Sequence, residues 1–131
     1  MNTELLQPEV QEFVAKNLNA DVSALVLKGS PFPKVTAAEL ATQIAGRKTA
    51  ERKLPVWFEN QHIIYPPKLN LEQTSSQITA EYKASLVSGE NLTDLTGGFG
   101  IDSYFFSKKI QNVIYNELNT DLAEIVQHNY K

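Results

Sequence analysis

A cluster of glycines near the C-terminal end of the chain constrains its fold more than any other feature. Three of the six glycines, Gly97, Gly98 and Gly100, fall within four residues, between a strand-like stretch at residues 91–95 and a helical pattern at residues 101–110. A strand can turn into a helix within so few residues only where the backbone adopts conformations that side chains disfavour. The cluster therefore predicts a strand, a glycine loop and a helix in succession.

The residues after the loop repeat this alternation of strand and helix. Residues 113–117 are β-branched and aromatic, as in a short buried strand, and residues 120–130 have apolar positions at helical spacing. Residues 91–131 thus read as a β-α-β-α unit, in which the two strands are expected to be parallel. The fold class predicted for the chain is α/β.

The N-terminal region is predicted to be mostly helical. Asp21 can cap a short helix over residues 22–28, and the sequence from Thr36 to Glu39 is a capping box that starts a longer one. Residues 55–58 and 62–65 are aromatic and β-branched around a polar turn, which predicts a β-hairpin at residues 55–66. The paired prolines Pro66 and Pro67 then suggest a boundary between regions 1–67 and 68–131.

One further helix is predicted between the prolines and the glycine loop. From Leu71 to Val87 the pattern is helical, with Leu71, Ile78, Tyr82 and Leu86 on one stripe, and Gly89 would end the helix. This helix lies after the paired prolines and therefore belongs to the second predicted region, 68–131.

Composition restricts the class of protein. With 131 residues, 42% of them hydrophobic and 21% charged, and with no cysteine, the chain is not a disordered tail, a collagen-like chain or a disulfide-stapled module. The net charge of −3 gives no overall basic signature of nucleic-acid binding. No apolar stretch approaches the ~20 residues of a membrane span. We therefore expect a soluble cytoplasmic protein.

Acidic residues flank the glycine loop where a nucleoside cofactor could bind. Asp94 ends the first predicted strand, and Glu117 ends the second about 20 residues later, a position from which an acid can accept hydrogen bonds from ribose hydroxyls. Both S-adenosylmethionine and NAD fit this spacing. A pyrophosphate loop, however, would need a third glycine where Ser103 stands, and carboxylates at Asp94 and Asp102 would repel it. The same acids suit a ligand with an ammonium and a sulfonium.

These motifs resemble a known enzyme family. The run Asp94-Leu-Thr-Gly-Gly-Phe-Gly-Ile-Asp102 is similar to motif I of class I S-adenosylmethionine-dependent methyltransferases, and Val113-Ile-Tyr-Asn-Glu117 is similar to the acidic motif that follows. Thr96 departs from the pattern, because the first glycine of motif I usually stands there. The resemblance implies that Asp94 and the backbone of Gly98 to Gly100 hold the methionine end of the cofactor, that Glu117 holds its ribose, and that Asp102 makes a further polar contact. The cofactor-binding residues expected in this way are Asp94, Thr96, Gly98, Gly100, Asp102 and Glu117.

A narrower resemblance points to RNA as the substrate. Together with the helix that precedes it, the glycine-loop run is similar to a bacterial methyltransferase group that carries a THUMP-like domain later in the chain and is presumed to modify RNA. The Rossmann-like methyltransferase fold has about seven strands, of which two are expected here. The resemblance thus implies the N-terminal fragment of a larger enzyme, inactive alone and able to self-associate through its unpaired strand edges. It identifies no catalytic residue.

Two other functions remain open at this point. The chain could be a non-catalytic helical interaction module whose C-terminal unit is a scaffold, or part of an NAD-dependent oxidoreductase with a Rossmann fold.

Several conspicuous residues have an ordinary structural explanation. The basic residues at the end of the third predicted helix suit its dipole and a solvated surface, and the aromatic residues of 57–65 suit a core. His62 and His128 lack partners at metal-ligand spacing, so no metal site is expected. The basic residues are Arg47, Lys48, Arg52 and Lys53, and the aromatic residues are Trp57, Phe58 and Tyr65.

Overall fold

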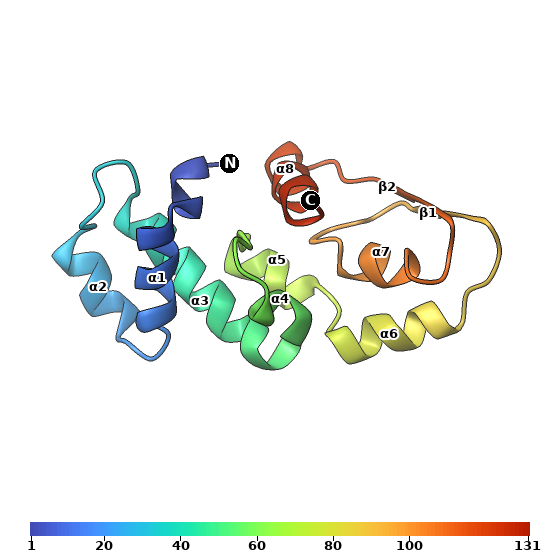
Figure 1. Ribbon diagram of the computed structural model, residues 1–131, viewed down its shortest axis with the longest axis horizontal. Coiled ribbons are helices and arrows are strands. Elements are labelled where there is room, and N and C mark those ends of the chain that lie inside the picture. Colours follow the sequence, from blue (N-terminus) through green and yellow to red (C-terminus); the bar gives the residue numbers. More distant parts are fainter.

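Eight α-helices, one 3-10 helix and two short strands make up the chain in a computed structural model that describes residues 1–131 (Figure 1). The N-terminal half contains η1 (Thr3–Leu6), α1 (Pro8–Lys16), α2 (Val22–Lys28), α3 (Ala37–Lys53) and α4 (Pro55–Glu59). The C-terminal half contains α5 (Lys68–Gln73), α6 (Gln77–Ser85), β1 (Asn91–Asp94), α7 (Ile101–Phe106), β2 (Asn112–Tyr115) and α8 (Thr120–Asn129).

The C-terminal half contains the predicted β-α-β-α unit. Strands β1 and β2 pair in parallel, with Leu92 opposite Val113 and Asp94 opposite Tyr115. Helix α7 connects them, and in Figure 1 it lies between the strands and α6. The α/β class and the parallel pairing are therefore confirmed. Both helices of the unit are shorter than predicted, since α7 ends at Phe106 and α8 at Asn129.

The predicted helix starts in the N-terminal half are confirmed by their caps. Asp21 Oδ1 accepts hydrogen bonds from the backbone N–H groups of Ser23 and Ala24 at the start of α2. At the start of α3, the Glu39 N–H donates to Thr36 Oγ1 at 3.2 Å, and the Thr36 N–H donates to Glu39 Oε2 at 2.8 Å. Each contact satisfies an amide that the helix itself leaves unpaired.

The predicted hairpin at residues 55–66 is wrong. Residues Pro55–Glu59 form α4, which the proline suits because its ring fits the first helical turn. Residues 63–65 belong to no helix and pair with no strand. Their backbone groups bond instead to side-chain amides: Gln43 to the N–H and C=O of Tyr65, and Asn129 to those of Ile64, all at 2.8–3.0 Å. The backbone of this strand-like segment is therefore hydrogen-bonded to side chains of α3 and α8 and not to another strand.

The single helix predicted after the prolines is two helices, α5 and α6. The chain is extended at Thr74, and Ser76 Oγ caps α6 by accepting from the Thr79 N–H at 3.2 Å. Because this break turns α6, only Leu71 of the predicted stripe is buried, whereas Ile78 and Tyr82 are 80% and 64% exposed. Leu86 is 67% exposed as well. Helix α6 packs against α7 through small residues instead, Ala80 and Ala84.

Two clusters of buried side chains form the core. The smaller joins η1, α1 and the start of α3 to Ile64, and the larger extends from the end of α3 to α8. The larger cluster includes Trp57 and Tyr65, which confirms their placement in the core. It takes side chains from both sides of Pro67, and the division into regions 1–67 and 68–131 stays a prediction.

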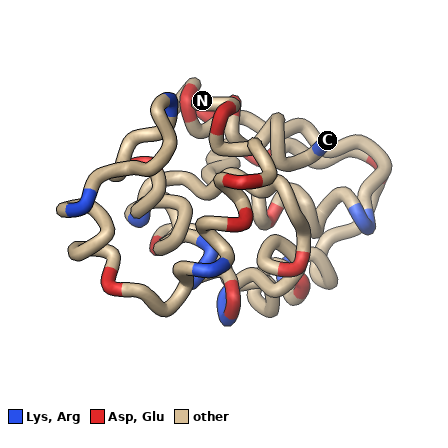
Figure 2. The backbone as a smooth tube through the Cα atoms, turned by 60° about the vertical axis from the view of Figure 1, so that its left-hand side comes forward, with Lys and Arg blue, Asp and Glu red and all other residues tan.

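Charged residues of both signs are interspersed along the chain (Figure 2). Three of the four basic residues near the end of α3 make internal contacts: Lys48 pairs with Glu51, Lys53 Nζ donates to the Leu71 carbonyl, and Arg47 donates to the Phe58 carbonyl. These contacts agree with a structural role for the cluster. None of the helices combines the length and the apolar character that a membrane-spanning helix requires.

Candidate cofactor site

The glycine loop between β1 and α7 is held by close packing. Gly98 and Gly100 have φ angles of +54° and +79°, in the left-handed region that favours glycine. A Cβ at Gly97 would overlap the ring of Tyr115, and one at Gly100 would lie 2.8 Å from Val126 on α8. Glycine at positions 97 and 100 therefore lets β2 and α8 approach the loop.

Both backbone polar groups of Gly98, its N–H and its carbonyl, are hydrogen-bonded to side chains at or just after the end of β2. Its N–H donates to Glu117 Oε2 at 2.9 Å, and its carbonyl accepts from the Tyr115 hydroxyl at 2.7 Å. Burial, with smaller contributions from the carboxylates of Glu117 and Asp94, raises the pKa of Tyr115 to about 12. Tyr115 therefore remains a donor at neutral pH.

Asp94 and Gly100 shape the loop and do not line the cavity beside it. Asp94 accepts from the Ser103 hydroxyl at 2.6 Å and from the Thr96 N–H at 3.2 Å, which ties β1 to the first turn of α7. The Gly100 carbonyl accepts a hydrogen bond from the Tyr130 hydroxyl.

A cavity of about 370 Å³ lies beside the loop, which is within the usual range for small-molecule sites. Thr96, Gly98, Asp102 and Glu117 line it, so four of the six predicted residues share one cavity. The other wall comes from α5, α6 and the turn between them, and it is mostly polar. The residues of that wall are Asn70, Gln73, Thr74, Ser75 and Lys83.

The two walls meet at Asp102. Its Oδ2 accepts from Lys83 Nζ at 2.8 Å and from the Ser75 hydroxyl at 3.2 Å. Its Oδ1 is buried and has no hydrogen-bond partner in the chain. An unpaired buried carboxylate oxygen is costly, and because Oδ1 is closed off from solvent it is not the atom through which Asp102 can meet a ligand in the cavity.

The cofactor-binding residues predicted from the sequence did not include Lys83 or Ser75. Lys83 precedes the loop by more than a dozen residues. It lies in α6, and the apolar pattern did not predict which face of that helix is buried. Its position at the cavity follows from the packing of α6 on α7. The run of hydroxyl residues at 74–76 was the one local signal that this segment faces a polar site.

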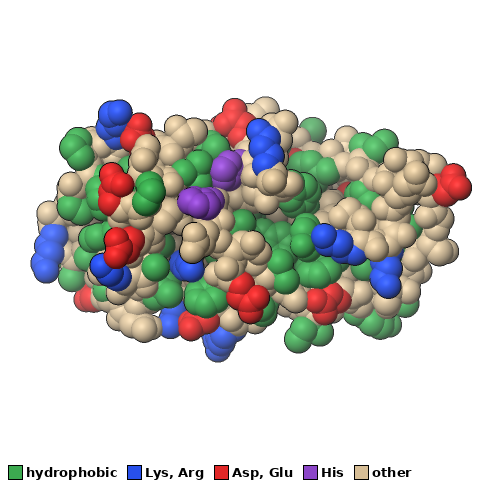
Figure 3. Space-filling view, viewed as in Figure 1, with side chains coloured by type: hydrophobic (Ala, Val, Ile, Leu, Met, Phe, Trp, Pro, Cys, Tyr) green, Lys and Arg blue, Asp and Glu red, His purple; other side chains and the backbone are tan.

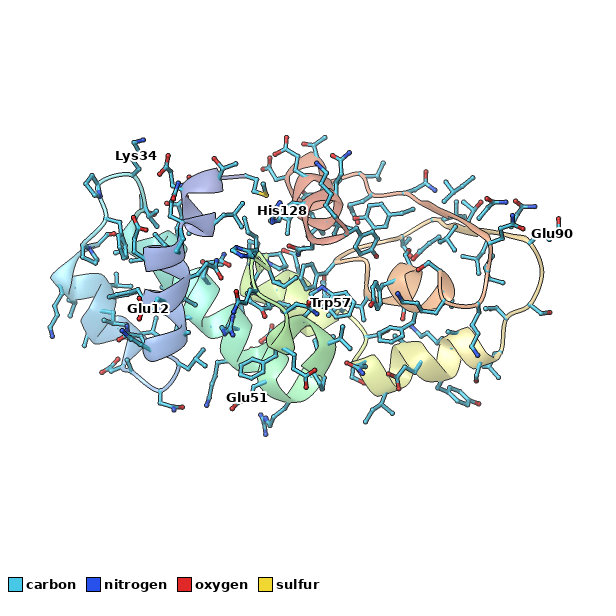
Figure 4. All side chains as sticks on the ribbon, in the orientation of Figure 1. Glu12, Lys34, Glu51, Trp57, Glu90 and His128 are labelled. Carbon is cyan, nitrogen blue, oxygen red and sulfur yellow. The ribbon has the colours of Figure 1, made fainter.

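A second cavity, of about 380 Å³, lies between α4, α7 and the end of α8. Figure 3 shows the two histidine side chains next to each other on this face, and Figure 4 labels His128 and Trp57 near it. His128 Nε2 lies 2.9 Å from the His62 carbonyl oxygen. The cavity has no carboxylate side chain in its lining, and no group of three metal-ligating side chains occurs in the chain.

Comparison with known proteins gives one structural relative. No protein-family model and no curated protein sequence matches the chain. The crystal structure of a protein described as a putative methyltransferase from Porphyromonas gingivalis W83 matches with a TM-score of 0.79 and 31% sequence identity. The match covers 98% of this chain and 32% of that protein. The chain is thus related over nearly its whole length to about a third of that protein.

Proposed function

We propose that the chain binds S-adenosylmethionine in the glycine-loop cavity and forms the cofactor-binding start of a methyltransferase that acts on RNA. The observation that carries the proposal is the exposure of the Gly98 backbone to a polar cavity that Glu117 and Asp102 also line. The relationship to a described methyltransferase supports the cofactor. The resemblance of the glycine-loop run to the THUMP-like group supports the RNA substrate.

The shape of the loop fits a bound nucleoside cofactor. A Cβ built on Gly98 would meet nothing nearer than the Thr96 carbonyl oxygen at 3.9 Å, so the missing side chain leaves space on the cavity side. Glycine is otherwise needed there only for its φ of +54°. A ligand can therefore approach the backbone closely at this point.

The charges fit a cationic cofactor. Two carboxylates, Asp102 and Glu117, and one ammonium, Lys83, line the cavity, which leaves a surplus of one negative charge. S-adenosylmethionine carries a sulfonium and an ammonium against one carboxylate, so the signs are complementary. When bound, it supplies an electrophilic methyl group, and the residues of the chain hold and orient it.

The hydrogen bonds of the loop disfavour a pyrophosphate. In a dinucleotide site, the N–H groups of the loop bind phosphate oxygens. Here the N–H groups of Thr96 and Gly98 already donate to the carboxylates of Asp94 and Glu117. Those of Gly97 and Gly100 donate to backbone carbonyls at 2.8 Å. A pyrophosphate would have to displace two carboxylates, which argues against NAD.

Calorimetric titration of the chain tests the proposal. We expect S-adenosylmethionine and S-adenosylhomocysteine to bind and NAD not to bind. Glu117→Gln should weaken binding by at least ~tenfold, because a carboxylate contact with ribose hydroxyls is charge-assisted. Glu51→Gln, at a residue of α3 that pairs with Lys48 and does not line the cavity, serves as the control variant. Binding of NAD alone would contradict the proposal, and binding of neither ligand would favour a helical interaction module.

The RNA substrate needs a separate measurement, since the chain spans about a third of its structural relative. The measurement uses a methyltransferase in which this chain forms the cofactor-binding part, supplied with labelled S-adenosylmethionine, and compares methyl transfer to RNA with methyl transfer to protein. Labelling of RNA alone supports the proposal, whereas labelling of protein alone contradicts the substrate and leaves the cofactor unaffected.

A further inference from the structure

The second cavity, of about 380 Å³ between α4, α7 and the end of α8, combines an apolar floor with a polar rim. Trp57 and Ile63 in the floor are 3% and 9% exposed, and the Tyr104 ring packs edge to face on Trp57 with the centroids 4.8 Å apart. The rim consists of three exposed polar residues, Asn60, Gln61 and His62. An apolar floor of this kind accepts a flat ring, while amides at the rim can hydrogen-bond to the edge of that ring.

His62 is the one residue other than glycine that has a positive φ angle, +64°. Side chains disfavour this left-handed conformation, whereas a glycine would adopt it at no steric cost. The turn therefore does not explain the imidazole, whose ring lies next to that of His128 on the face shown in Figure 3. A costly backbone conformation at the edge of a cavity points to a role for the side chain there.

The charges around this cavity suit a phosphate-bearing ligand. No carboxylate side chain lines it, and the side-chain ammonium of Lys131 is offset by the terminal carboxylate of the same residue. Lys108 Nζ lies 4.3 Å from the centroid of the Tyr104 ring and supplies a cation beside the floor. The glycine-loop cavity, in contrast, is lined by Asp102 and Glu117. A phosphodiester is therefore more favourable beside the second cavity than in the first.

A layer of buried aromatic side chains separates the two cavities. Phe99 lines the glycine-loop cavity and Trp57 lines the second one, and their ring centroids are 6.4 Å apart. Both side chains are almost fully buried, at 2% and 3% exposed. A ligand in the second cavity is thus close to the proposed cofactor site and closed off from it, so it is not the group that receives the methyl.

We infer that the second cavity binds one unpaired nucleotide of the RNA, next to the nucleotide that is methylated or near it. The base lies on the floor formed by Trp57 and Tyr104, with the imidazole of His62 against it. Gln61 hydrogen-bonds to the edge of the base, and Lys108 faces the phosphate. The inference rests on the proposed function and deepens it, because it gives the RNA a contact outside the methyl-transfer site.

Trp57 makes occupancy of this cavity directly measurable. It is the only tryptophan of the chain, so tryptophan fluorescence reports on the cavity that it lines. The chain is titrated, without cofactor, with a single-stranded RNA of about eight nucleotides, with the single-stranded DNA of the same sequence and with the RNA duplex. We expect a saturable change with the single-stranded RNA and a much weaker one with the duplex, because paired and stacked bases cannot enter the cavity.

His62→Gly is the decisive variant. It removes the imidazole and relieves the left-handed backbone, so it should fold at least as well as the wild type. We expect it to lose at least ~fivefold in affinity for single-stranded RNA, since one stacking contact disappears, and to keep its affinity for S-adenosylhomocysteine. Tyr82→Ala is the matched control, because it removes a ring that is 64% exposed and lies outside the lining of the cavity. It should leave the RNA affinity unchanged.

The outcomes separate this inference from the proposed function. Unchanged RNA affinity in His62→Gly would overturn the inference, as would equal losses in His62→Gly and Tyr82→Ala. A wild type whose Trp57 fluorescence does not respond to single-stranded RNA, or responds equally to the duplex, would overturn it too. Tighter binding of the DNA strand than of the RNA strand would contradict RNA as the ligand. The proposed function is decided independently, by calorimetry with S-adenosylhomocysteine and by methyl transfer to RNA.

Discussion

The N–H of Gly98 donates a hydrogen bond to Glu117 Oε2 at 2.9 Å, across 19 residues of sequence. Gly98 lies in the loop after β1, and Glu117 lies just beyond the end of β2. Parallel pairing of the strands brings their carboxyl ends to one edge, and this contact fixes the loop at that edge. The second carboxylate oxygen of Glu117 accepts from the Asn119 N–H at 2.8 Å, which orients the carboxylate beside the cavity.

The first prediction concerns the open side of Gly98. In Gly98→Ala, the new methyl group occupies the space where we place the cofactor, and we expect affinity for S-adenosylhomocysteine to fall at least ~tenfold, as measured by calorimetry. The left-handed φ of +54° also costs about 1–2 kcal/mol of folding free energy for a residue with a side chain.

Gly29→Ala is the matched control, because Gly29 has a φ of +82°, lies outside the cavity lining and has no atom within 4 Å of a built Cβ. With its ψ of 174°, Gly29 has a backbone conformation that is essentially restricted to glycine, so Gly29→Ala should cost at least as much stability as Gly98→Ala and leave ligand affinity unchanged. Equal affinity losses in the two variants would mean that Gly98 acts only through backbone strain.

The second prediction concerns Gly46 in the middle of α3. In an exposed helix, Gly→Ala stabilises by about 1 kcal/mol. At Gly46 a Cβ would overlap the side chain of Tyr65, with Tyr65 Cγ at 2.7 Å. We expect Gly46→Ala to lower the free energy of unfolding by about 1–3 kcal/mol in urea titrations. The exposed neighbour provides the comparison: Ala45→Gly should cost about 1 kcal/mol from propensity alone. A Gly46→Ala variant more stable than the wild type would contradict the close packing of α3 on Tyr65.

The third prediction concerns Gln43, a polar side chain that is 4% exposed. Its amide bonds to both the N–H and the C=O of Tyr65, at 2.8 and 2.9 Å. Gln43→Leu leaves these two buried backbone groups unpaired, and we expect a loss of about 2–4 kcal/mol in the free energy of unfolding. Gln127→Leu, at an exposed position of α8, should change stability by less than about 0.5 kcal/mol. Similar values for the two variants would show that Tyr65 finds other partners.

The fourth prediction concerns stability at high pH. Burial raises the pKa of Tyr65 to about 12, with Arg47 opposing the shift, whereas an unfolded tyrosine titrates near 10. The folded chain therefore binds more protons than the unfolded chain between these values. It follows that the stabilising contribution of Tyr65 is complete below pH 10 and is lost as the pH rises toward 12.

Urea titrations at several pH values from 8 to 11 measure this effect. Tyr65→Phe should reduce the decline of stability with pH, and Tyr82→Phe should not, because Tyr82 is 64% exposed. A decline of the same steepness in Tyr65→Phe and in the wild type would rule out the buried hydroxyl as its cause. Tyr115, with a pKa of about 12, contributes to the decline in the same direction in all three proteins.

Local signals predicted the elements whose stabilisation is itself local. The capping residues of α2 and α3 act on amides two or three positions away, so their sequence pattern is sufficient. The glycine loop is also a local signal, because left-handed backbone at Gly98 and Gly100 requires glycine wherever the loop lies. The order of strand, loop, helix and strand followed from these features, and the parallel pairing from that order.

Tertiary contacts decided what the local pattern could not. Residues 63–65 have strand-like composition, yet their hydrogen-bond partners are Gln43 and Asn129, amides on helices that are distant in sequence. The stripe from Ile78 to Leu86 has helical spacing, yet the break at Thr74 turns α6 so that its alanines pack on α7. Local spacing specifies which residues share a face, and it does not specify which face another element covers.

In the candidate site, too, some features follow from the sequence and others depend on tertiary packing. By itself, the sequence determined the glycine loop and the acids at the ends of its two strands, because backbone conformation and strand direction depend on nearby residues. Only the tertiary structure placed Lys83 and Ser75 against Asp102, because that wall depends on the packing of α6 against α7. It also shows that Asp94 accepts a hydrogen bond from Ser103 and the Gly100 carbonyl one from Tyr130, while the cofactor-binding role of both residues stays a prediction.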